Sequence, residues 1–209
     1  MEVIKKSLGQ MGTNCYVLWD EKSGEAAVID PGFRDQRIVD IINQKKLKVK
    51  YILLTHGHFD HLGGVSQIRD LTGAKVLIHR NDADCLTNAG RNLSTLVGMP
   101  FDLTAADGYL SEGEDVKIGD LTVQVFHTPG HSKGGVCFLV GDTLFAGDTL
   151  FHASIGRTDF ADGDLGELLN GIQSKLFVLD DAIKVLPGHG ENTTIGYEKA
   201  CNPFFKGRV

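Results

Sequence analysis

Candidate metal-binding side chains constrain this chain more than any other feature. Four of them occur within six residues: His56, His58, Asp60 and His61. Three more follow at wide intervals, each beside a glycine: His131, Asp148 and His189. Imidazole nitrogens and carboxylate oxygens bind divalent transition metals. If all seven side chains meet at one place, the segments between residues 56 and 189 must belong to one folded unit.

Seven ligands are too many for one tetrahedral ion, but they suit two ions that share a carboxylate. In an extended segment, residues i and i+2 point the same way, so His56 and His58 can face one ion together. We expect His131 to complete this three-histidine group.

The second ion is expected to bind at the start of the following helix. Asp60 and His61 are adjacent there and point away from the first pair, and His189 is expected to join them. Asp148 carries two carboxylate oxygens and is the natural bridge between the ions. Each ion then keeps an open position, which distinguishes a catalytic site from a closed structural one.

Other acidic and histidine residues have weaker signals. Asp30 ends a strand pattern and is expected either to accept the second N–H of a metal-bound imidazole or to stabilise a turn. The remaining histidines, His79, His127 and His152, lack the ligand pattern and are expected to have structural or surface roles.

The segments between these motifs alternate between strand and helix patterns. The apolar run Tyr51–Leu54 is typical of a strand that is covered on both faces, and it leads directly into the metal motif. Helices are predicted near residues 35–44, 61–71, 81–86, 165–176 and 195–201. Two strand-rich halves predict an α/β (α+β) protein in which two sheets pack face to face with helices outside. With no linker or repeat, residues 1–209 are expected to form a single domain.

Composition argues against several classes of function. A net charge of −6 disfavours a nucleic-acid binder, and the one basic run, within residues 45–50, is expected to be a solvated helix end. The four cysteines form no C-x-x-C pair, which fits a reducing cytosol. No signal peptide and no run of 18 apolar residues is visible. We therefore expect a cytoplasmic protein that binds neither nucleic acid nor membrane. The oligomeric state stays open.

The motifs resemble those of the metallo-β-lactamase fold superfamily. Its H-x-H-x-D-H signature is matched by residues 56–61, its later ligands by His131, Asp148 and His189, and an early family aspartate by Asp30. Residues 147–151, 155–160 and 187–194, with Asn202-Pro203-Phe204, resemble short single-domain members of the hydroxyacylglutathione hydrolase (glyoxalase II) branch. The resemblance implies a four-layer αββα sandwich with two metal ions at one edge.

Departures from related families refine this expectation. Full-length glyoxalase II carries a C-terminal helical domain that grips glutathione, whereas this sequence ends twenty residues after His189, and Lys206 and Arg208 alone are not expected to replace such a domain. Thioester hydrolysis is therefore implied more strongly than glutathione specificity. No cysteine falls in a ligand motif, which argues against β-lactamases with a cysteine ligand, and His58 replaces the glutamate of flavodiiron proteins.

The expected reaction is hydrolysis of a small-molecule thioester by a hydroxide that bridges the two metal ions. Asp60 is the expected catalytic residue, which orients the hydroxide and handles its proton. Arg157 is expected either to bind a substrate carboxylate in a forked contact or to form a surface salt bridge. Zinc is the first expectation for the metal, and iron or manganese could replace it.

Other interpretations stay open. Persulfide dioxygenases with mononuclear iron share a stretch similar to Gly156–Phe160, but the Pro187–Gly190 motif favours a hydrolase. A lactone or other ester hydrolase could use the same site, and a non-catalytic metal-stabilised module is the non-enzyme interpretation. The irregular but apolar segment Gly90–Ala106 is expected to pack onto the body, to wall the substrate channel or to cover a partner subunit.

Overall fold

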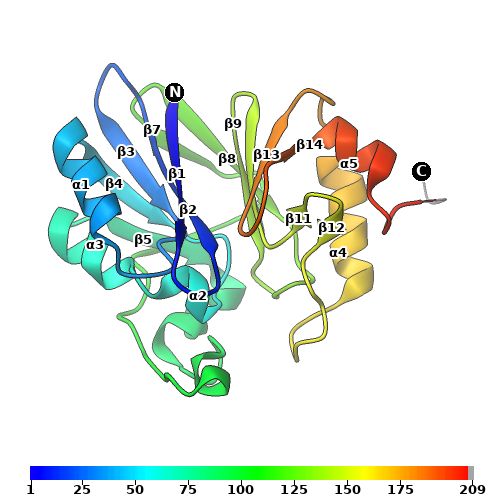
Figure 1. The fold of residues 1–209 in the computed structure, drawn as a ribbon, viewed down its shortest axis with the longest axis horizontal. Coiled ribbons are helices and arrows are strands. Elements are labelled where there is room, and N and C mark those ends of the chain that lie inside the picture. Colours follow the sequence, from blue (N-terminus) through cyan, green and yellow to red (C-terminus); the bar gives the residue numbers. More distant parts are fainter. Residues whose placement is uncertain (207–209) are drawn as a thin grey trace.

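The computed structural model describes residues 1–206, so Arg208 lies outside the described residues. Two six-stranded sheets pack face to face, and helices cover both outer faces (Figure 1). The covering helices are α1 (Gln36–Lys45) and α3 (Val65–Thr72) on one side, and α4 (Leu165–Gly171) and α5 (Ile195–Cys201) on the other. This αββα sandwich confirms the predicted fold class.

The first half of the chain forms the first sheet, in the order β1-β2-β3-β4-β5-β6. Its strands are β1 (Glu2–Leu8), β2 (Thr13–Trp19), β3 (Glu25–Ile29), β4 (Lys48–Leu53), β5 (Lys75–His79) and β6 (Gly108–Leu110). Strands β1 to β3 are antiparallel, and β3 to β6 pair in parallel. The carboxyl ends of β3, β4 and β5 therefore lie at the same edge.

The second half forms the second sheet, in the order β14-β13-β10-β9-β8-β7. Its strands are β7 (Asp115–Ile118), β8 (Leu121–His127), β9 (Val136–Val140), β10 (Thr143–Gly147), β13 (Lys184–Pro187) and β14 (Thr193–Thr194). Strands β10 and β13 are parallel, so both end at the same edge. A small hairpin, β11 (Leu150–Phe151) and β12 (Ser154–Ile155), follows β10.

Alternating residues of the central strands supply two different cores. In β3, Val28 packs toward the helices while Ala27 and Ile29 pack between the sheets. In the same way, Ile52 of β4 faces the helices and Leu53 faces the second sheet. Side chains of a strand alternate between its faces, and each fully buried aliphatic side chain stabilises the fold by about 1.5–3 kcal/mol. Burial on both faces explains why these strands are continuously apolar.

One predicted helix is divided in two. The pattern over residues 61–71 predicted a single helix, but α2 (Phe59–Leu62) and α3 are separated at Gly63 and Gly64. The loop after β3 packs against this break, and the Gly64 N–H donates to the carbonyl oxygen of Pro31 (2.7 Å). A Cβ atom at Gly64 would lie 2.5 Å from the carbonyl oxygen of Phe33. The prediction was wrong here because the cause is a contact distant in sequence.

The remaining helices largely follow the prediction. The segment near residues 81–86 is a 3₁₀ helix, η1 (Arg80–Thr87), rather than an α-helix. The predicted 165–176 helix begins at the expected cap, where Asp164 accepts the N–H of Glu167, and continues beyond α4 as a π-helical turn, Ile172–Leu176. Within residues 1–206, no helix is both long enough and apolar enough to cross a membrane.

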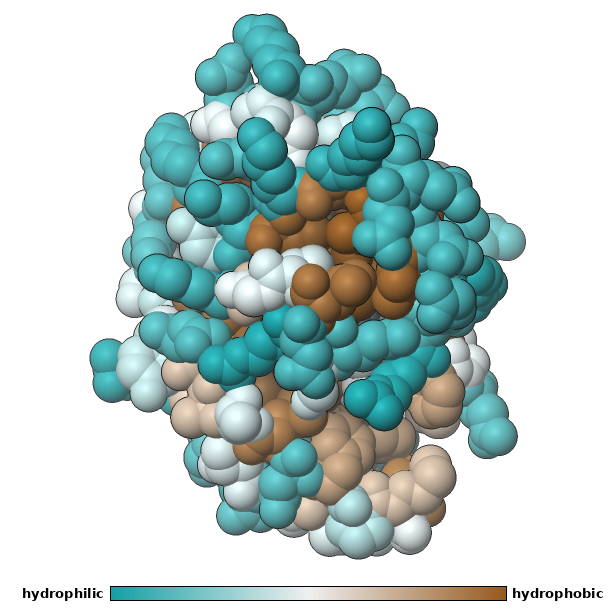
Figure 2. Space-filling model, turned by 90° about the vertical axis from the view of Figure 1, so that its left-hand side faces the viewer, coloured by the Kyte–Doolittle hydropathy of each residue, from teal (hydrophilic) through white to brown (hydrophobic). Residues whose placement is uncertain are grey.

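The apolar segment Gly90–Ala106 has mixed surroundings. Phe101, Leu103 and Ala106 pack against the core beneath α1 and α3, as one of the three expectations stated. Leu96 and Met99 instead stay 72% and 63% exposed around the short 3₁₀ helix η2 (Ser94–Val97). Seen from the α1 and α3 side, tan and brown side chains gather at the lower end of the molecule, where this segment lies (Figure 2).

Candidate metal centre

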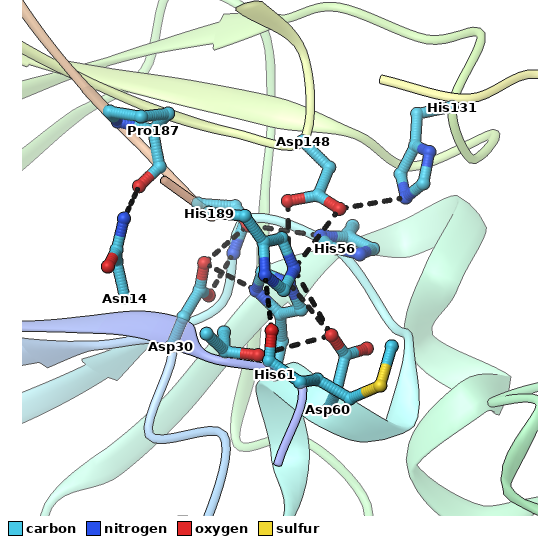
Figure 3. A network of polar contacts seen from close by, with 12 residues as sticks. Asn14, Asp30, His56, Asp60, His61, His131, Asp148, Pro187 and His189 are labelled. Carbon is cyan, nitrogen blue, oxygen red and sulfur yellow. Dashed lines mark hydrogen bonds and ion pairs between the residues drawn. The ribbon is translucent and has the colours of Figure 1, made fainter. Parts of the chain in front are cut away.

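The seven predicted ligands come together at the edge where the strands of both sheets end. Residues 56–61 follow β4, His131 lies between β8 and β9, Asp148 follows β10, and His189 follows β13. Three sets of residues each have possible ligand atoms within 4.8 Å of one another. They are His56, His58 and His131; Asp60, His61 and His189; and His56, His61 and Asp148. The first two sets are the two groups that the sequence spacing predicted. Figure 3 shows six of the seven side chains, all except His58, around Asp148.

Asp148 stands between the two groups. Its Oδ2 atom lies 3.5 Å from Nε2 of His131 in the three-histidine group and 3.6 Å from Nε2 of His189 in the other group. Its Oδ1 atom lies 3.4 Å from Nε2 of His61. The carboxylate therefore has the position that the sequence analysis expected of a bridge between two ions.

The hydrogen bonds of the histidines leave their Nε2 atoms directed into the cluster. The Nδ1–H of His131 donates to the carbonyl oxygen of Arg157 (2.8 Å), and that of His189 faces the carbonyl oxygen of Met11 (3.2 Å). The Nδ1 atom of His61 contacts Oδ2 of Asp30 (2.9 Å). An N–H on Nδ1 leaves a lone pair on Nε2, which is the arrangement that metal-ligating histidines adopt.

Unsatisfied polar atoms also fit a metal centre. Among residues 1–206, the buried side-chain nitrogen and oxygen atoms without a hydrogen-bond partner are Nε2 of His56, Nε2 of His131 and Oδ1 of Asp148. Buried polar atoms almost always have a partner, so three unpartnered atoms in one cluster need an explanation. A divalent cation bound by these nitrogen and oxygen donors would satisfy all three, so the residues present fit two metal ions.

Asp30 connects the cluster to the end of β4. It accepts the N–H (2.8 Å) and the hydroxyl (2.6 Å) of Thr55 in addition to its contact with His61. The Thr55 hydroxyl thus donates to Asp30 and is free to accept the Nδ1–H of His56 at 3.1 Å. The contact with an imidazole is one of the two roles expected of Asp30, and the same carboxylate orients His61 directly and His56 through Thr55.

The two groups differ in charge. Burial, followed by the positive charge of His131, lowers the pKa of His58 to about 3, and burial lowers the pKa of His56 well below its usual value. Burial alone would also lower the pKa of His61, but the neighbouring carboxylates of Asp148, Asp60 and Asp30 raise it to about 10. His56 and His58 are therefore neutral, as metal-ligating imidazoles must be, while His61 holds a proton that a cation would replace.

The loop that carries His189 is held by strand β2. The carbonyl oxygen of Pro187 accepts hydrogen bonds from Nδ2 of Asn14 (2.9 Å) and from the hydroxyl of Tyr16 (2.6 Å). Thr13 on the same strand donates its hydroxyl to Oδ2 of Asp60 (3.1 Å). Figure 3 shows Asn14 pointing toward Pro187, at the left of the view. Strand β2 thus positions two members of one group.

Asp82 is a residue that sequence reasoning missed. It is buried and accepts hydrogen bonds from the N–H of Gly57 (2.9 Å), the hydroxyl of Ser132 (2.7 Å) and the N–H of Gly134 (2.6 Å). It therefore ties the loop of His56 and His58 to the loop of His131. Its close approach requires glycine, because a Cβ at position 134 would lie 2.6 Å from Cγ of Asp82. No local signal in the sequence separates Asp82 from the nearby exposed aspartates.

A cavity of about 360 Å³ opens over the cluster. Its lining includes members of both groups and an apolar set that consists of Met11, Phe59, Leu93, Phe151, Ile155 and Phe160. Arg157 also lines it, but its guanidinium donates twice to Asp159 (2.7 Å each) and lies over the ring of Phe160. Of the two roles expected for Arg157, the salt bridge is present, and contact with a substrate carboxylate stays a prediction.

The other three histidines lie outside the cluster, where the sequence analysis expected them. His79 and His127 stack on each other with ring centroids 4.0 Å apart, which joins the ends of β5 and β8. His152 contacts Tyr197 and lies 4.0 Å from Glu191. None of them is among the three candidate ligand sets found within residues 1–206.

The fold and the cluster match one family of proteins. The model of the metallo-beta-lactamase superfamily matches residues 8–189, which include all seven candidate ligands. The chain therefore belongs to the metallo-beta-lactamase superfamily and is a metal-dependent hydrolase of that superfamily.

Three known proteins are similar to the chain over nearly its whole length. The hydroxyacylglutathione hydrolase GloC of Haemophilus influenzae is 36% identical over 199 residues, which span 93% of each chain. The crystal structure of the BLEG-1 B3 metallo-beta-lactamase superposes with a TM-score of 0.93 and 38% identity over 99% of this chain and 100% of that one. TTHA1623 in a di-iron-bound form has a TM-score of 0.85 and 33% identity over 96% and 99% of the two chains.

Proposed function

We propose that this protein hydrolyses thioesters at a centre of two divalent metal ions. The observation that supports this most directly is the pair of ligand groups that share Asp148 at the floor of one cavity. The sequence identity of 36% with a hydroxyacylglutathione hydrolase, over 93% of both chains, favours a thioester among the possible substrates. The two ions would be held by His56, His58 and His131, by Asp60, His61 and His189, and by Asp148 between them.

Divalent ions at such a centre supply Lewis-acid activation of a carbonyl group and of water. The chain's own residues do the rest. The Nδ1–H bonds of His61, His131 and His189 fix each ring so that Nε2 faces the cavity floor. Burial alone would raise the pKa of Asp60, but the charge of His61 and the hydrogen bond from His189 lower it. Asp60 is therefore an ionised carboxylate on the cavity wall, which can accept a hydrogen bond from water and orient it. We propose that it also takes up the proton of that water.

Aromatic side chains of the cavity lining stand beside the candidate ligands. Phe160 lies edge-on to His58 with ring centroids 5.2 Å apart, and Phe151 lies beside His189 at 6.3 Å. These rings limit the positions in which a carbonyl group can reach the cluster. We propose that they orient the thioester so that its carbonyl carbon faces the side of Asp60.

The proposal is tested by measuring thiol release from S-lactoylglutathione and from acyl-thioesters of other thiols, together with metal analysis of the purified protein. We expect two metal ions per chain and thiol release that a chelator abolishes and added metal restores. Zinc is the metal we expect, and the di-iron form of TTHA1623 supports iron as the second possibility. Two bound ions with no thiol release from any thioester would refute the proposed substrate class.

Hydrolysis of a β-lactam is a second candidate, because the similar BLEG-1 structure is that of a B3 metallo-beta-lactamase. The absence of cysteine from the three candidate ligand sets of residues 1–206 removes only the cysteine-ligand class from consideration. Parallel assays with a chromogenic cephalosporin and with thioesters separate the two candidates. We expect kcat/KM to be higher for the thioester, and the opposite order would favour the β-lactamase.

An iron-dependent persulfide dioxygenase and a lactone or ester hydrolase are two further candidate functions. Two complete ligand groups support two ions over a single iron, since Asp60, His61 and His189 lie as close together as the three-histidine group. Oxygen uptake with glutathione persulfide would favour the dioxygenase. Turnover of lactones faster than of thioesters would favour the ester hydrolase.

A further inference from the structure

Leu93 has a backbone conformation that branched side chains avoid. Its φ of 68° and ψ of 6° lie in the left-handed region. In that region the Cβ atom approaches the following carbonyl oxygen, which is why glycine is usually found there. Strain of this kind persists only where the surrounding structure enforces it, and it occurs most often at functional sites.

Asn92 enforces this conformation. Its buried side chain donates through Nδ2 to the carbonyl oxygens of Cys85 (3.0 Å) and Phe101 (3.1 Å), and its Oδ1 accepts the N–H of Ser94 (3.0 Å). The carbonyl oxygen of Asn92 accepts the N–H of Phe59 (2.8 Å), the residue between His58 and Asp60. The turn at Leu93 is therefore fixed to the backbone of the metal motif.

The strained turn places an aliphatic side chain in the cavity wall. Leu93 lines the cavity, while Leu96, three residues later, is 72% exposed and does not. The other walls contain Phe151, Ile155 and Phe160. Among the described residues, Arg157 is the one lysine or arginine in the lining, and Asp159 already neutralises it.

A cavity of about 360 Å³ is at the small end of the range for small-molecule sites, and the acyl group, which adjoins the reacting carbonyl, is a part of the thioester that can enter it. The thiol part can extend into solvent, whereas the acyl group must lie against the walls. A charged acyl group would lose its hydration against the apolar walls, and the one arginine of the lining is already paired with Asp159.

We propose that Leu93 is a specificity-determining residue that selects a short, uncharged, apolar acyl group. The inference rests on the proposed thioester hydrolysis and names the substrate class of that same site. The rigid position of Leu93 limits the depth of the acyl pocket, because Asn92 prevents the turn from relaxing when a longer chain enters.

The test uses N-acetylcysteamine thioesters with straight acyl chains from acetyl to octanoyl, and the succinyl thioester as a charged acyl group. The metal-loaded wild type is compared with Leu93→Ala and Leu93→Gly, with Leu96→Ala as the matched control from the same segment. We expect the wild type to prefer a short apolar chain. Both Leu93 variants should lose about ten-fold in kcat/KM for that chain and prefer longer ones, since a methylene in an apolar pocket changes kcat/KM by about 10–200-fold. Leu96→Ala should keep the wild-type profile.

Thermal melting gives a readout that does not depend on turnover. Leu93→Gly relieves the strained backbone and Leu93→Ala does not, so the glycine variant should melt at the higher temperature of the two. An equal or lower melting temperature would contradict the enforced strain.

The outcomes separate this inference from the proposed function. If the wild type hydrolyses thioesters and the chain-length profile is the same in both Leu93 variants, the role of Leu93 is refuted and the proposed function stands. A preference for the succinyl thioester would refute the selection of uncharged groups. If the wild type releases thiol from none of the thioesters, the proposed function and this inference fail together.

Discussion

The two ligand groups of the metal centre are built in different ways. The three-histidine group is almost fully buried, and burial keeps the pKa values of His56 and His58 low, so these two rings are neutral. The other group is more accessible: the side chains of His189 and Asp60 are 26% and 13% exposed. It is also charged, because carboxylates surround His61 and raise its pKa.

This difference shows two ways of holding ligands in place. The three-histidine group depends on the backbone of two loops, which Asp82 joins through hydrogen bonds to Gly57 and Gly134. The second group depends on side-chain contacts, above all that of Asp30 with His61. Asp30 contacts His61 directly and reaches His56 only through the Thr55 hydroxyl. Changes at Asp82 should therefore weaken mainly the ion of the three-histidine group, and changes at Asp30 mainly the ion of the second group.

The largest effect is expected from a change at Asp60, which belongs to the accessible ligand group and also lines the cavity. Asp60→Asn keeps the size of the side chain but removes its charge and its ability to accept a proton. Thiol release should fall roughly 10²–10⁴-fold, the usual contribution of general acid–base catalysis. Turnover within a few-fold of wild type, at equal metal content, would exclude the proposed role of Asp60.

A pair of variants tests whether the two groups are independent. Asp82→Asn should weaken the ion of the three-histidine group, and Asp30→Asn the ion of the second group, each by about 10–100-fold in affinity. Calorimetric titration of the metal-free protein should resolve one strong and one weakened binding event in each variant. Equal weakening of both events by either variant would show that the two groups act as one unit.

Gly57→Ala tests the backbone dependence of the buried group. The added Cβ would lie 2.4 Å from Cβ of Cys85, so the loop or the 3₁₀ helix η1 must shift. We expect the free energy of unfolding to fall by about 1–3 kcal/mol, as for other overpacked sites. Chemical denaturation measures this change, and Gly73→Ala is a control, since no atom of the described residues lies within 4 Å of a Cβ there. Gly73 has a positive φ (69°), so Gly73→Ala itself lowers the free energy of unfolding. Overpacking at Gly57 is therefore shown only if Gly57→Ala lowers the free energy of unfolding by more than Gly73→Ala does.

The smallest effect is expected from the loss of one hydrogen bond that supports the His189 loop. Tyr16→Phe removes one of two hydrogen bonds to the carbonyl oxygen of Pro187, while Asn14 keeps the other. The cost should be about 0.5–1.5 kcal/mol in the free energy of unfolding, with thiol release changed by no more than a few-fold. A loss of activity as large as that of Asp60→Asn would mean that the accessible group is as sensitive to its backbone as the buried one.

The sequence allowed the seven clustered residues to be predicted because their signal is local. Five of them lie in loops that follow a strand, and Asp60 and His61 lie in the short helix α2 directly after such a loop. The i, i+2 spacing of His56 and His58 sets their common direction. Asp82 and Asn92 could not be predicted in this way. Their partners lie in other loops, and nothing local distinguishes buried Asp82 from Asp84, which pairs with Arg91 at the surface.

The fold was predictable to a similar degree. Apolar strands that are buried on both faces, such as β4, indicated sheets covered by helices. The break between α2 and α3 was missed because its cause is the backbone of Pro31 and Phe33, some thirty residues earlier. The strained turn at Leu93 was missed because Asn92 holds it through hydrogen bonds to the carbonyl oxygens of Cys85 and Phe101, and both of these residues lie outside the turn.

Because His56, His58, Asp60 and His61 follow the first sheet, and His131, Asp148 and His189 follow strands of the second, each bound ion would cross-link the two halves of the sandwich. Ligands that bind only the folded state stabilise it, by about 2.7 kcal/mol at a concentration one hundred times their Kd. A chelator should then act as a mild denaturant of the whole molecule, and the melting temperature should follow the concentration of free metal.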